Sequence, residues 1–528
     1  MRTARLLVSA LFLSLAAVST AKPLAVCTDA SPEGFDVVQY NSLVTTNASA
    51  DVLMNRLVEF DETARKVVPS LAVSWKISPD GLNYEFALRR GVAFHSTPWF
   101  KPGRPFNADD VVQTFDRMLN PGNPWFKTSP TGYPHAQSLS LNKLIRRIVK
   151  VDPYTVRFEL NYPDATFLSD LTMGFASIYS AEYLERLLAE GRQGDLNQKP
   201  VGTGPFVFSG YVKDSVVRYQ ANPAYFGGRP KASALIFAIT PDAATRYQRL
   251  AAGECQIAVG LKPQDVASAR ANRQLRVLEA PAFMTAFVAF NTRKKPFDDV
   301  RVRKAVNLAF DRQAYLSGVF AGSASPATLV FPPSAWGYAR DVKPWPHDIA
   351  AAKKLMAEAG LGSGVETTLW VRPSGSVLNP NPRLGAELLQ SDLAKIGIRA
   401  QIRVIEWGEL IKRGKAGEHD LLFMGWSGDN GDPDNFLTPQ FSCAAVESGT
   451  NFARVCDPKL DGWIKSAKAT SDVKTRTGLY RNAQKLIHDD ALWLPLAHPT
   501  AYGVTRATVT GWHVSPFGRL HLETAAAN

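Results

Sequence analysis

The chain has little cysteine and almost no long apolar runs, and both shortages limit what it can be. It contains four cysteines, and none of them has the C-x-x-C spacing of a zinc site. No apolar run after the first twenty or so residues is long enough to cross a membrane. The hydrolase motifs H-E-x-x-H and G-x-S-x-G are also missing. These absences argue against a cysteine-based metal site, an integral membrane protein and a secreted hydrolase.

Charge is not concentrated in any one stretch. The net charge is +12, or +10 once Arg2 and Arg5 are left out, and the lysines and arginines are scattered. This pattern indicates a solvated basic surface, although a preference for anionic ligands or for a membrane surface also fits it. We expect no nucleic-acid partner and no cofactor.

The first 21 residues have the layout of a secretory signal. Arg2 and Arg5 form a basic start, Leu6–Val18 is an apolar core, and Ser19-Thr20-Ala21 is a small-residue cleavage site. The core is too short for a stable membrane anchor. The mature protein is therefore expected to start near Lys22 and to be periplasmic.

Export to an oxidising compartment suits disulfide bonds. Cys27, Cys255, Cys443 and Cys456 allow three pairings. The last two are near in sequence and could close a small loop, in which case the first two would tie the amino-terminal part to a distant segment. Lipidation of Cys27 is the weaker interpretation, because two residues separate its motif from the apolar core and a bulky valine precedes it.

A length of 528 residues predicts two or three domains. Apolar periodicity predicts strands at Leu24–Cys27, Ala72–Ile77, Tyr84–Leu88, Ile148–Leu160 (two strands around a turn), Ala234–Ile239, Ala286–Asn291, Glu366–Val371, Ile398–Ile405, Leu421–Met424 and Leu492–Val504. It predicts helices that begin at Asn107, Asp242, Asp298, Ile349 and Leu384. The strand and helix alternation in the second half of the chain indicates a partly parallel α/β domain.

The stretch Met424–Phe436 is the strongest candidate for a binding site. It contains Gly425, Gly428, Gly431, Trp426, Asp429, Asp432 and Asp434. Glycines allow a close backbone approach, and carboxylates beside an aromatic side chain suit a small cation such as an ammonium group. An acidic turn after a strand is the alternative. An EF-hand calcium loop fails, because the twelfth position counted from Asp429 or from Asp432 is not glutamate.

Several motifs together point to one family. They are Ser31–Phe35, Asn55–Phe60, Ser78–Gly81, Leu88–Val92, Asn107–Val112, Val201–Phe206, Gly253–Cys255 and Gly425–Phe436. With them, nearly all of the mature chain resembles the periplasmic dipeptide-binding proteins of ATP-driven (ABC) importers, in the peptide- and nickel-binding class of family 5 solute-binding proteins. The resemblance implies a two-lobed α/β periplasmic-binding-protein fold of class II type (cluster C), with an extra α+β domain on the first lobe.

The resemblance also implies domain boundaries and a mode of action. The first lobe would comprise residues 22–52, 199–283 and 499–528, the extra domain 53–198, and the second lobe 284–498. The lobes would close by hinge motion around a peptide or peptide-like solute and deliver it to an inner-membrane permease. A non-catalytic monomer is expected, with disulfides Cys27–Cys255 and Cys443–Cys456. A chaperone or signalling receptor with the same lobes is the third functional class considered, after a binding protein and a hydrolase.

Closure around a peptide buries an ammonium and a carboxylate, so such a receptor needs an acid and a base. Asp429 occupies the position that grips the peptide ammonium in the relatives, and Gly428 and Trp426 lie beside it. Trp407 matches a tryptophan near the ligand pocket, although a core aromatic is an equal alternative.

The base departs from the family pattern. The dipeptide binder has an arginine for the peptide carboxylate in the stretch that matches Pro373–Asn379, and here Ser376 takes its place. Arg372 or Arg383 could compensate, although each is more often a surface arginine. Leu43 stands where the relative has a glycine, which would narrow the pocket. These departures put a plain dipeptide in doubt and leave a peptide of another size, one with a modified carboxyl end, glutathione or haem as alternatives.

Overall fold

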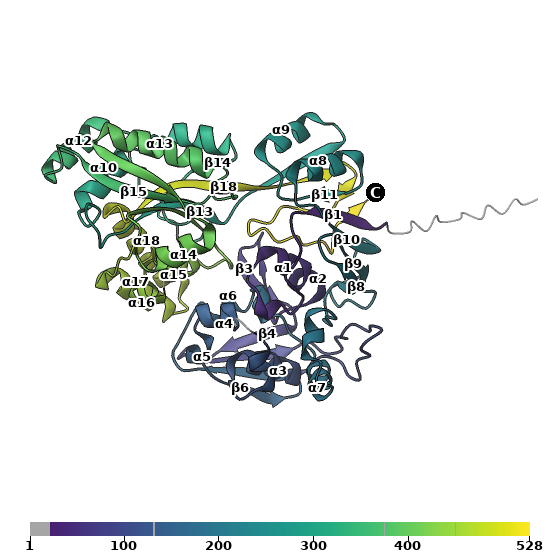
Figure 1. Cartoon of the computed structure of the whole chain (residues 1–528). Coiled ribbons are helices and arrows are strands. Elements are labelled where there is room, and N and C mark those ends of the chain that lie inside the picture. Colours follow the sequence, from purple (N-terminus) through teal and green to yellow (C-terminus); the bar gives the residue numbers. More distant parts are fainter. Residues whose placement is uncertain (1–21, 130–131, 374, 449, 528) are drawn as a thin grey trace, which may run out of the picture.

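The structure is a computed structural model that describes residues 22–129, 132–373, 375–448 and 450–527. The expected secretory signal, residues 1–21, lies outside the described residues. Figure 1 shows the two lobes side by side, with the extra domain below the first lobe. Within the described ranges, no helix is both long enough and apolar enough to cross a membrane.

One large sheet runs through both lobes. Its strands lie in the order β16 (Ile398–Val404), β15 (Val365–Val371), β17 (Leu421–Ser427), β13 (Met284–Phe290), β18 (Trp493–Arg506), β11 (Ile257–Ala258), β1 (Leu24–Thr28), β10 (Ala234–Ile239), β9 (Val216–Ala221) and β8 (Phe206–Val212). Two more strands, β12 (Leu275–Pro281) and β14 (Ala324–Pro326), also pair with β18. The first four strands belong to the second lobe and the last five to the first lobe.

Strand β18 belongs to both lobes. Its first half pairs with β13 in the second lobe, and its second half pairs with β12 and β11. The sequence predicts strands at Leu492–Val504, and the structure has one strand of 14 residues there. The lobes are therefore joined by β18 and by the short link Ala282-Phe283 between β12 and β13.

The second lobe confirms the expected α/β alternation. Strand β15 runs parallel to both β16 and β17. The helices of the second lobe are α10 (Val300–Ala309), α11 (Arg312–Tyr315), α12 (Ile349–Glu358), α13 (Pro382–Lys395), α14 (Trp407–Lys415), α15 (Asp434–Phe441), α16 (Cys443–Ser448), α17 (Pro458–Lys468) and α18 (Val473–Asp489). Alternate residues of β13 enter separate apolar cores on the two faces of the sheet, which explains the continuous apolar run in its sequence.

The first lobe carries helices on the other half of the sheet. These are α1 (Leu43–Ala48), α2 (Ala50–Leu53), α8 (Ala243–Ala252) and α9 (Pro263–Ala271). Two short strands near the carboxyl end, β19 (Val509–Thr510) and β20 (Ala526–Ala527), pair with each other. A disulfide joins Cys27 in β1 to Cys255 just before β11, and a second joins Cys443 to Cys456 in the second lobe. Both pairings agree with those that the family resemblance implies.

The extra domain is built around a four-stranded antiparallel sheet. Its order is β4 (Ala72–Ile77), β5 (Asn83–Leu88), β7 (Thr155–Leu160) and β6 (Ile145–Asp152), and a hairpin of β2 (Val58–Asp61) and β3 (Lys66–Pro69) precedes it. Its helices are α3 (Ala108–Leu119), α4 (Pro134–Ser138), α5 (Leu141–Leu144), α6 (Phe167–Asp170) and α7 (Ala181–Ala189). One apolar core continues from this domain into the first lobe, so the two pack as one body.

Local signals account for most helix ends. Asn107 caps α3, as expected, with its side chain accepting from the backbone N–H of Asp109, and Asp110 completes a capping box. The expected cap at Asp298 is wrong by one residue. Asp299 caps α10, because the backbone N–H of Asp298 still donates to Lys294 in the preceding turn.

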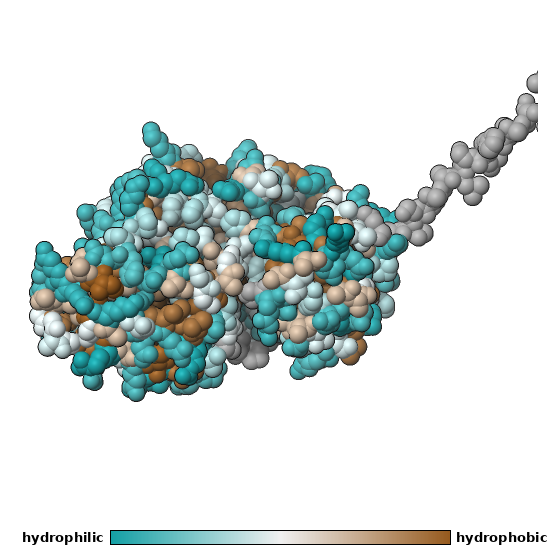
Figure 2. Space-filling model, turned by 90° about the horizontal axis from the view of Figure 1, so that it is seen from above, coloured by the Kyte–Doolittle hydropathy of each residue, from teal (hydrophilic) through white to brown (hydrophobic). Residues whose placement is uncertain are grey.

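The face of the molecule seen from above is mostly hydrophilic. Figure 2, which looks down on the molecule from above, shows teal and white residues with separate brown apolar patches, and a furrow between the two lobes. A cavity with mainly apolar walls lies between the lobes, as the next section describes.

Candidate functional site

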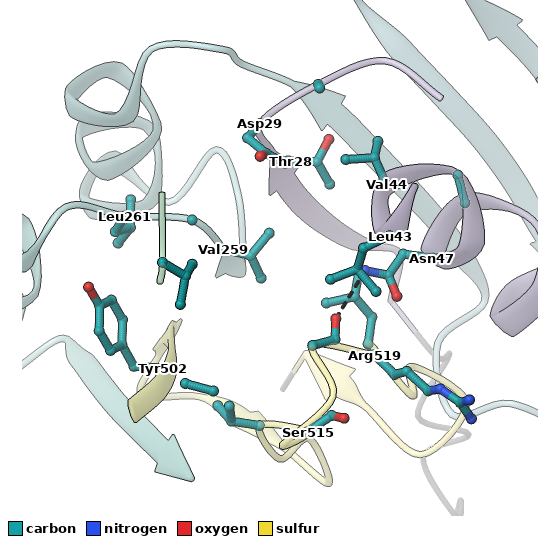
Figure 3. A pocket seen from close by; sticks show the side chains of 18 of the residues that line it. Thr28, Asp29, Leu43, Val44, Asn47, Val259, Leu261, Tyr502, Ser515 and Arg519 are labelled. Carbon is teal, nitrogen blue, oxygen red and sulfur yellow. Dashed lines mark hydrogen bonds between the residues drawn. The ribbon is translucent and has the colours of Figure 1, made fainter. Parts of the chain in front are cut away.

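A cavity of about 300 Å³ lies where the two lobes meet. The first lobe contributes one wall, from α1, β10 and the segment that follows β18 (Figure 3). The second lobe contributes Met284, Ser323, Val377 and Pro380, and β18 itself contributes Pro499 to Tyr502. The cavity therefore sits at the crossing point of the shared strand, where relative movement of the lobes changes its width.

The walls of this cavity are mainly apolar. Its lining includes Leu43, Val44, Phe237, Ile239, Val259, Leu261, Trp512, Val514 and Leu520. Among the described residues of the lining, Asp29 and Arg519 are the only carboxylate and the only basic side chain. A ligand here meets hydrocarbon over most of its surface, with polar groups reserved for a few places.

Asp429 lies beside the link between the lobes, directly after β17. The Asn435 side-chain oxygen accepts from the backbone N–H of Asp429 at 3.1 Å and from the indole N–H of Trp426 at 3.3 Å. The backbone N–H of Gly428 donates to Phe283 O at 2.8 Å. These bonds fix the backbone around the carboxylate, and a side-chain hydrogen bond with Asn435 also restrains the exposed carboxyl group of Asp429.

The Asp429 side chain is exposed to solvent, but the protein around it still removes part of the water that would hydrate the carboxylate. This partial loss of solvent raises the pKa of Asp429 to about 6, while the nearby positive charge of Arg519 opposes the rise. Because water still reaches the side chain, it screens part of both effects. The result is an accessible carboxylate that is ionised at pH 7 and only partly solvated, which suits an ammonium ligand.

The other two acids of the same stretch have different surroundings. Asp432 is buried and forms an ion pair with Arg476 of α18 at 2.8 Å. Asp434 is buried too, 3.7 Å from Lys468, and burial raises its pKa to about 6. Both carboxylates are occupied inside the protein, so Asp429 is the acid of this stretch that a ligand can reach.

Gly428 and Trp426 have structural roles that the geometry makes plain. A Cβ atom on Gly428 would lie 2.3 Å from the ring of Phe283, so only glycine allows the chain to pass the link between the lobes this closely. Trp426 is half-buried and packs at the edge of a second-lobe core. Both residues position Asp429.

Trp407 and Arg372 form a pair outside the cavity lining. The Arg372 guanidinium lies 4.6 Å from the centre of the Trp407 ring, and Trp407 is 41% exposed at the start of α14. Trp407 is therefore not the core aromatic of the alternative interpretation. The structure places the pair at the surface of the second lobe near the Ser376 loop.

The loop that carries Ser376, the residue in place of the family's arginine, is a tight turn. The Ser376 hydroxyl accepts from the backbone N–H of Asn379 at 3.2 Å, and its neighbour Val377 projects into the cavity with 55% of its surface exposed. Arg383 pairs with Glu387 at 2.9 Å on the outer face of α13. Of the two arginines considered as substitutes, Arg383 is thus a surface residue.

Leu43 lies in the cavity, as its position in the family implies. It is the first residue of α1, whose amino-terminal end is capped by Ser42, and 42% of its surface is exposed. Its side chain occupies the space above Gly518, where an added Cβ would lie 2.6 Å from it. A bulky residue here therefore makes the apolar wall continuous between α1 and the carboxyl-terminal segment.

Two residues near the site had no signal in the sequence. Arg519 comes from the carboxyl-terminal segment and Phe283 from the link between the lobes, whereas Asn435 lies within the predicted stretch Met424–Phe436. Arg519 is buried, and its Nη2 donates to the Thr172 backbone oxygen of the extra domain at 3.1 Å. Only long-range packing brings Arg519 and Phe283 to the site, so spacing along the chain cannot reveal them. Among the described residues, no group of three or more His, Cys, Asp or Glu side chains is arranged to hold a metal ion.

Two lobes joined by crossing segments, with a cavity between them, define a solute-binding protein that encloses its ligand. The chain belongs to the bacterial extracellular solute-binding proteins of family 5, whose middle-region profile matches residues 66–448. It is 62% identical over 518 residues to the probable di/tripeptide-binding protein 5 of Pseudomonas aeruginosa (strain UCBPP-PA14), with 98% of each chain covered.

Two solved structures are also similar. HbpA2 from Haemophilus parasuis is 39% identical with a TM-score of 0.90, and the match covers 96% of this chain and 100% of the other. The dipeptide binding protein from Pseudoalteromonas sp. SM9913, in complex with Met-Leu, is 34% identical with a TM-score of 0.83 and the same coverage. These likenesses confirm the expected two-lobed fold and the family.

Proposed function

We propose that this protein is the substrate-binding component of an ABC importer for short peptides. It captures a di- or tripeptide in the periplasm as a monomer, closes its lobes around it and delivers it to an inner-membrane permease. The relatives named di/tripeptide-binding proteins, and the similar structure with bound Met-Leu, support a peptide over other solutes. No catalytic step is part of this function.

The exposed carboxylate of Asp429 is the observation that carries the proposal. It is held by Asn435 and Gly428 beside the interlobe link, while Asp432 and Asp434 are paired internally. An ammonium group enclosed in the cleft needs a fixed anion, because burying it unpaired is costly. A free amino terminus is thus the ligand feature that this site is best suited to bind.

The first experiment is a thermal-shift screen of mature protein freed of ligand by unfolding and refolding. The panel contains dipeptides, tripeptides, amidated dipeptides, glutathione and haem. A ligand at a hundred times its dissociation constant stabilises the fold by about 2.7 kcal/mol, which raises the melting temperature visibly. A shift with di- or tripeptides supports the proposal, and a shift only with haem or glutathione contradicts it.

Substitution of the acid tests the site itself. Asp429→Asn should weaken binding of an unblocked peptide more than tenfold, about 1.4 kcal/mol or above, in calorimetry. Glu185→Gln is the matched control, since it removes one exposed carboxylate on α7 of the extra domain. Equal affinities of the two variants would exclude Asp429 as the ammonium partner.

A further inference from the structure

Two large apolar side chains project into the cavity from opposite lobes. Leu43 of the first lobe is 42% exposed, and Val377 of the second lobe is 55% exposed. Removal of apolar surface from water is favourable. Exposed hydrocarbon on both sides of one cavity therefore favours an apolar occupant that covers both side chains when the lobes close.

The charged groups of the cavity are at its edge and already have partners. Asp29 is exposed and interacts with the buried guanidinium of Arg246. Arg519 donates to Thr172 of the extra domain, and Figure 3 shows its guanidinium at the margin, away from Val259 and Leu261. A charged ligand side chain that entered between the apolar walls would lose its water, and Asp29 or Arg519 could pair with it only by weakening its present interaction.

The size of the cavity restricts its occupant further. A volume of about 300 Å³ is at the lower end of the range for small-molecule sites. Leu43 cannot easily withdraw, because Ser42 caps its helix and its side chain packs over Gly518. The first-lobe wall of the cavity therefore keeps its apolar shape when the lobes move.

We propose that this cavity is a side-chain subsite that selects short peptides carrying a bulky apolar side chain. Leu43 and Val377 close on that side chain from the two lobes, and peptides with a charged side chain at the same position are rejected. This inference rests on the proposed function, and it adds the substrate class and two residues that determine it.

A peptide series measures the selectivity. Calorimetry measures the affinity of the ligand-free protein for each of seven dipeptides: Leu-Ala, Ala-Leu, Gly-Gly, Asp-Ala, Ala-Asp, Lys-Ala and Ala-Lys. Leucine at one of the two positions should bind at least tenfold more tightly than glycine, aspartate or lysine at that position, since a few methylene groups in an apolar pocket distinguish ligands by this amount or more.

Placing a charge on the apolar wall tests the residues. Leu43→Asp should weaken Leu-peptide binding at least tenfold and narrow the difference between leucine and lysine peptides. Val377→Asp, on the facing lobe, should do the same. It provides a second variant in case Leu43→Asp fails to fold. Val473→Asp is the matched control: Val473 is also the first residue of a helix, capped by Asp472, and is 60% exposed.

The outcomes separate this inference from the proposed function. If all the peptides bind with equal affinity, or both cavity variants behave like Val473→Asp, the subsite assignment is wrong while peptide binding stands. If no peptide binds the wild-type protein, the proposed function fails and the subsite fails with it. Selectivity for leucine that both cavity variants abolish supports the inference.

Discussion

At the scale of single residues, surroundings separate three acids that look alike in the sequence. Asp429, Asp432 and Asp434 occur within six positions of one another, and their residue types give no reason to prefer one. Arg476 neutralises Asp432 and Lys468 neutralises Asp434, while Asp429 is exposed. The family resemblance points to Asp429 as the ammonium partner, and the internal ion pairs leave it as the accessible acid of the three.

The raised pKa of Asp429 predicts that peptide binding depends on pH. Below about pH 6 the carboxyl group takes up a proton and loses its attraction for an ammonium group, so affinity should fall about tenfold between pH 7 and pH 5. Above about pH 8 the peptide amine itself loses its proton, and affinity should fall again. Calorimetry with one peptide from pH 5 to pH 9 measures both limits.

Asp429→Asn is the control for the acid limit. With an amide in place of the carboxyl group, the decrease below pH 6 should disappear and the decrease above pH 8 should remain. An acid limit of equal size in this variant would assign it to another group, such as Asp434, whose pKa is also raised to about 6 by burial.

At the scale of elements, the loop between β17 and α15 joins the ligand site to the extra domain. The Asn430 side chain donates to Asp170 of α6 at 2.8 Å, and Lys468 of α17 pairs with Asp164 at 3.0 Å. Burial raises the pKa of Asp170, and Asp164 adds to the rise. The loop that carries Asp429 thus also contacts the extra domain, through its neighbour Asn430.

Gly431→Ala tests how much that docking depends on close approach. A Cβ atom there would lie 1.9 Å from the ring of Phe60 in β2, so either the ring or the loop must move. Such overpacking typically costs about 1–3 kcal/mol, and displacement of the loop should weaken peptide binding as well. Chemical denaturation and calorimetry measure the two effects.

Gly462→Ala is the matched control, because nothing lies within 4 Å of its added Cβ on α17. Alanine there should leave binding unchanged and stabilise the helix by up to about 1 kcal/mol. If both alanine variants unfold at the same denaturant concentration as the wild type, the loop tolerates a wider separation from β2.

The sequence predicted those elements whose signals are local. Three kinds of signal act over a few residues and predicted their elements correctly. They are the cap of α3, the glycines that follow α12 and α13, and the apolar run of β13. Helix α15 carries Pro439 inside it, a residue that normally argues against a helix, and no helix was predicted there. Arg519 and Phe283 join the site only through tertiary packing, so no pattern along the chain marks them.

At the scale of the whole molecule, two disulfides close loops of very different length. Cys27–Cys255 spans 228 positions and Cys443–Cys456 spans 13. If a crosslink acts mainly by restricting the unfolded chain, the longer loop contributes about 5 kcal/mol and the shorter about 3 kcal/mol.

Paired alanine substitutions test this order. Cys27→Ala with Cys255→Ala should lower the stability to urea more than Cys443→Ala with Cys456→Ala. A larger loss from the short loop would mean that local structure in the second lobe, and not chain entropy, sets the contribution of the disulfides. Reduction of the wild-type protein should reproduce the sum of both losses.

The strand shared by the lobes has a consequence for how the chain matures. β13 in the second lobe and β11 and β12 in the first all pair with β18, which the chain reaches only at residues 493–506. Pairing across such long sequence separations is slow, because the chain must close large loops before any contact forms. A growing chain therefore has neither lobe complete until residues 493–506 have been made. We expect this delay to keep an exported chain unfolded during its passage across the membrane. Folding would then be completed after export.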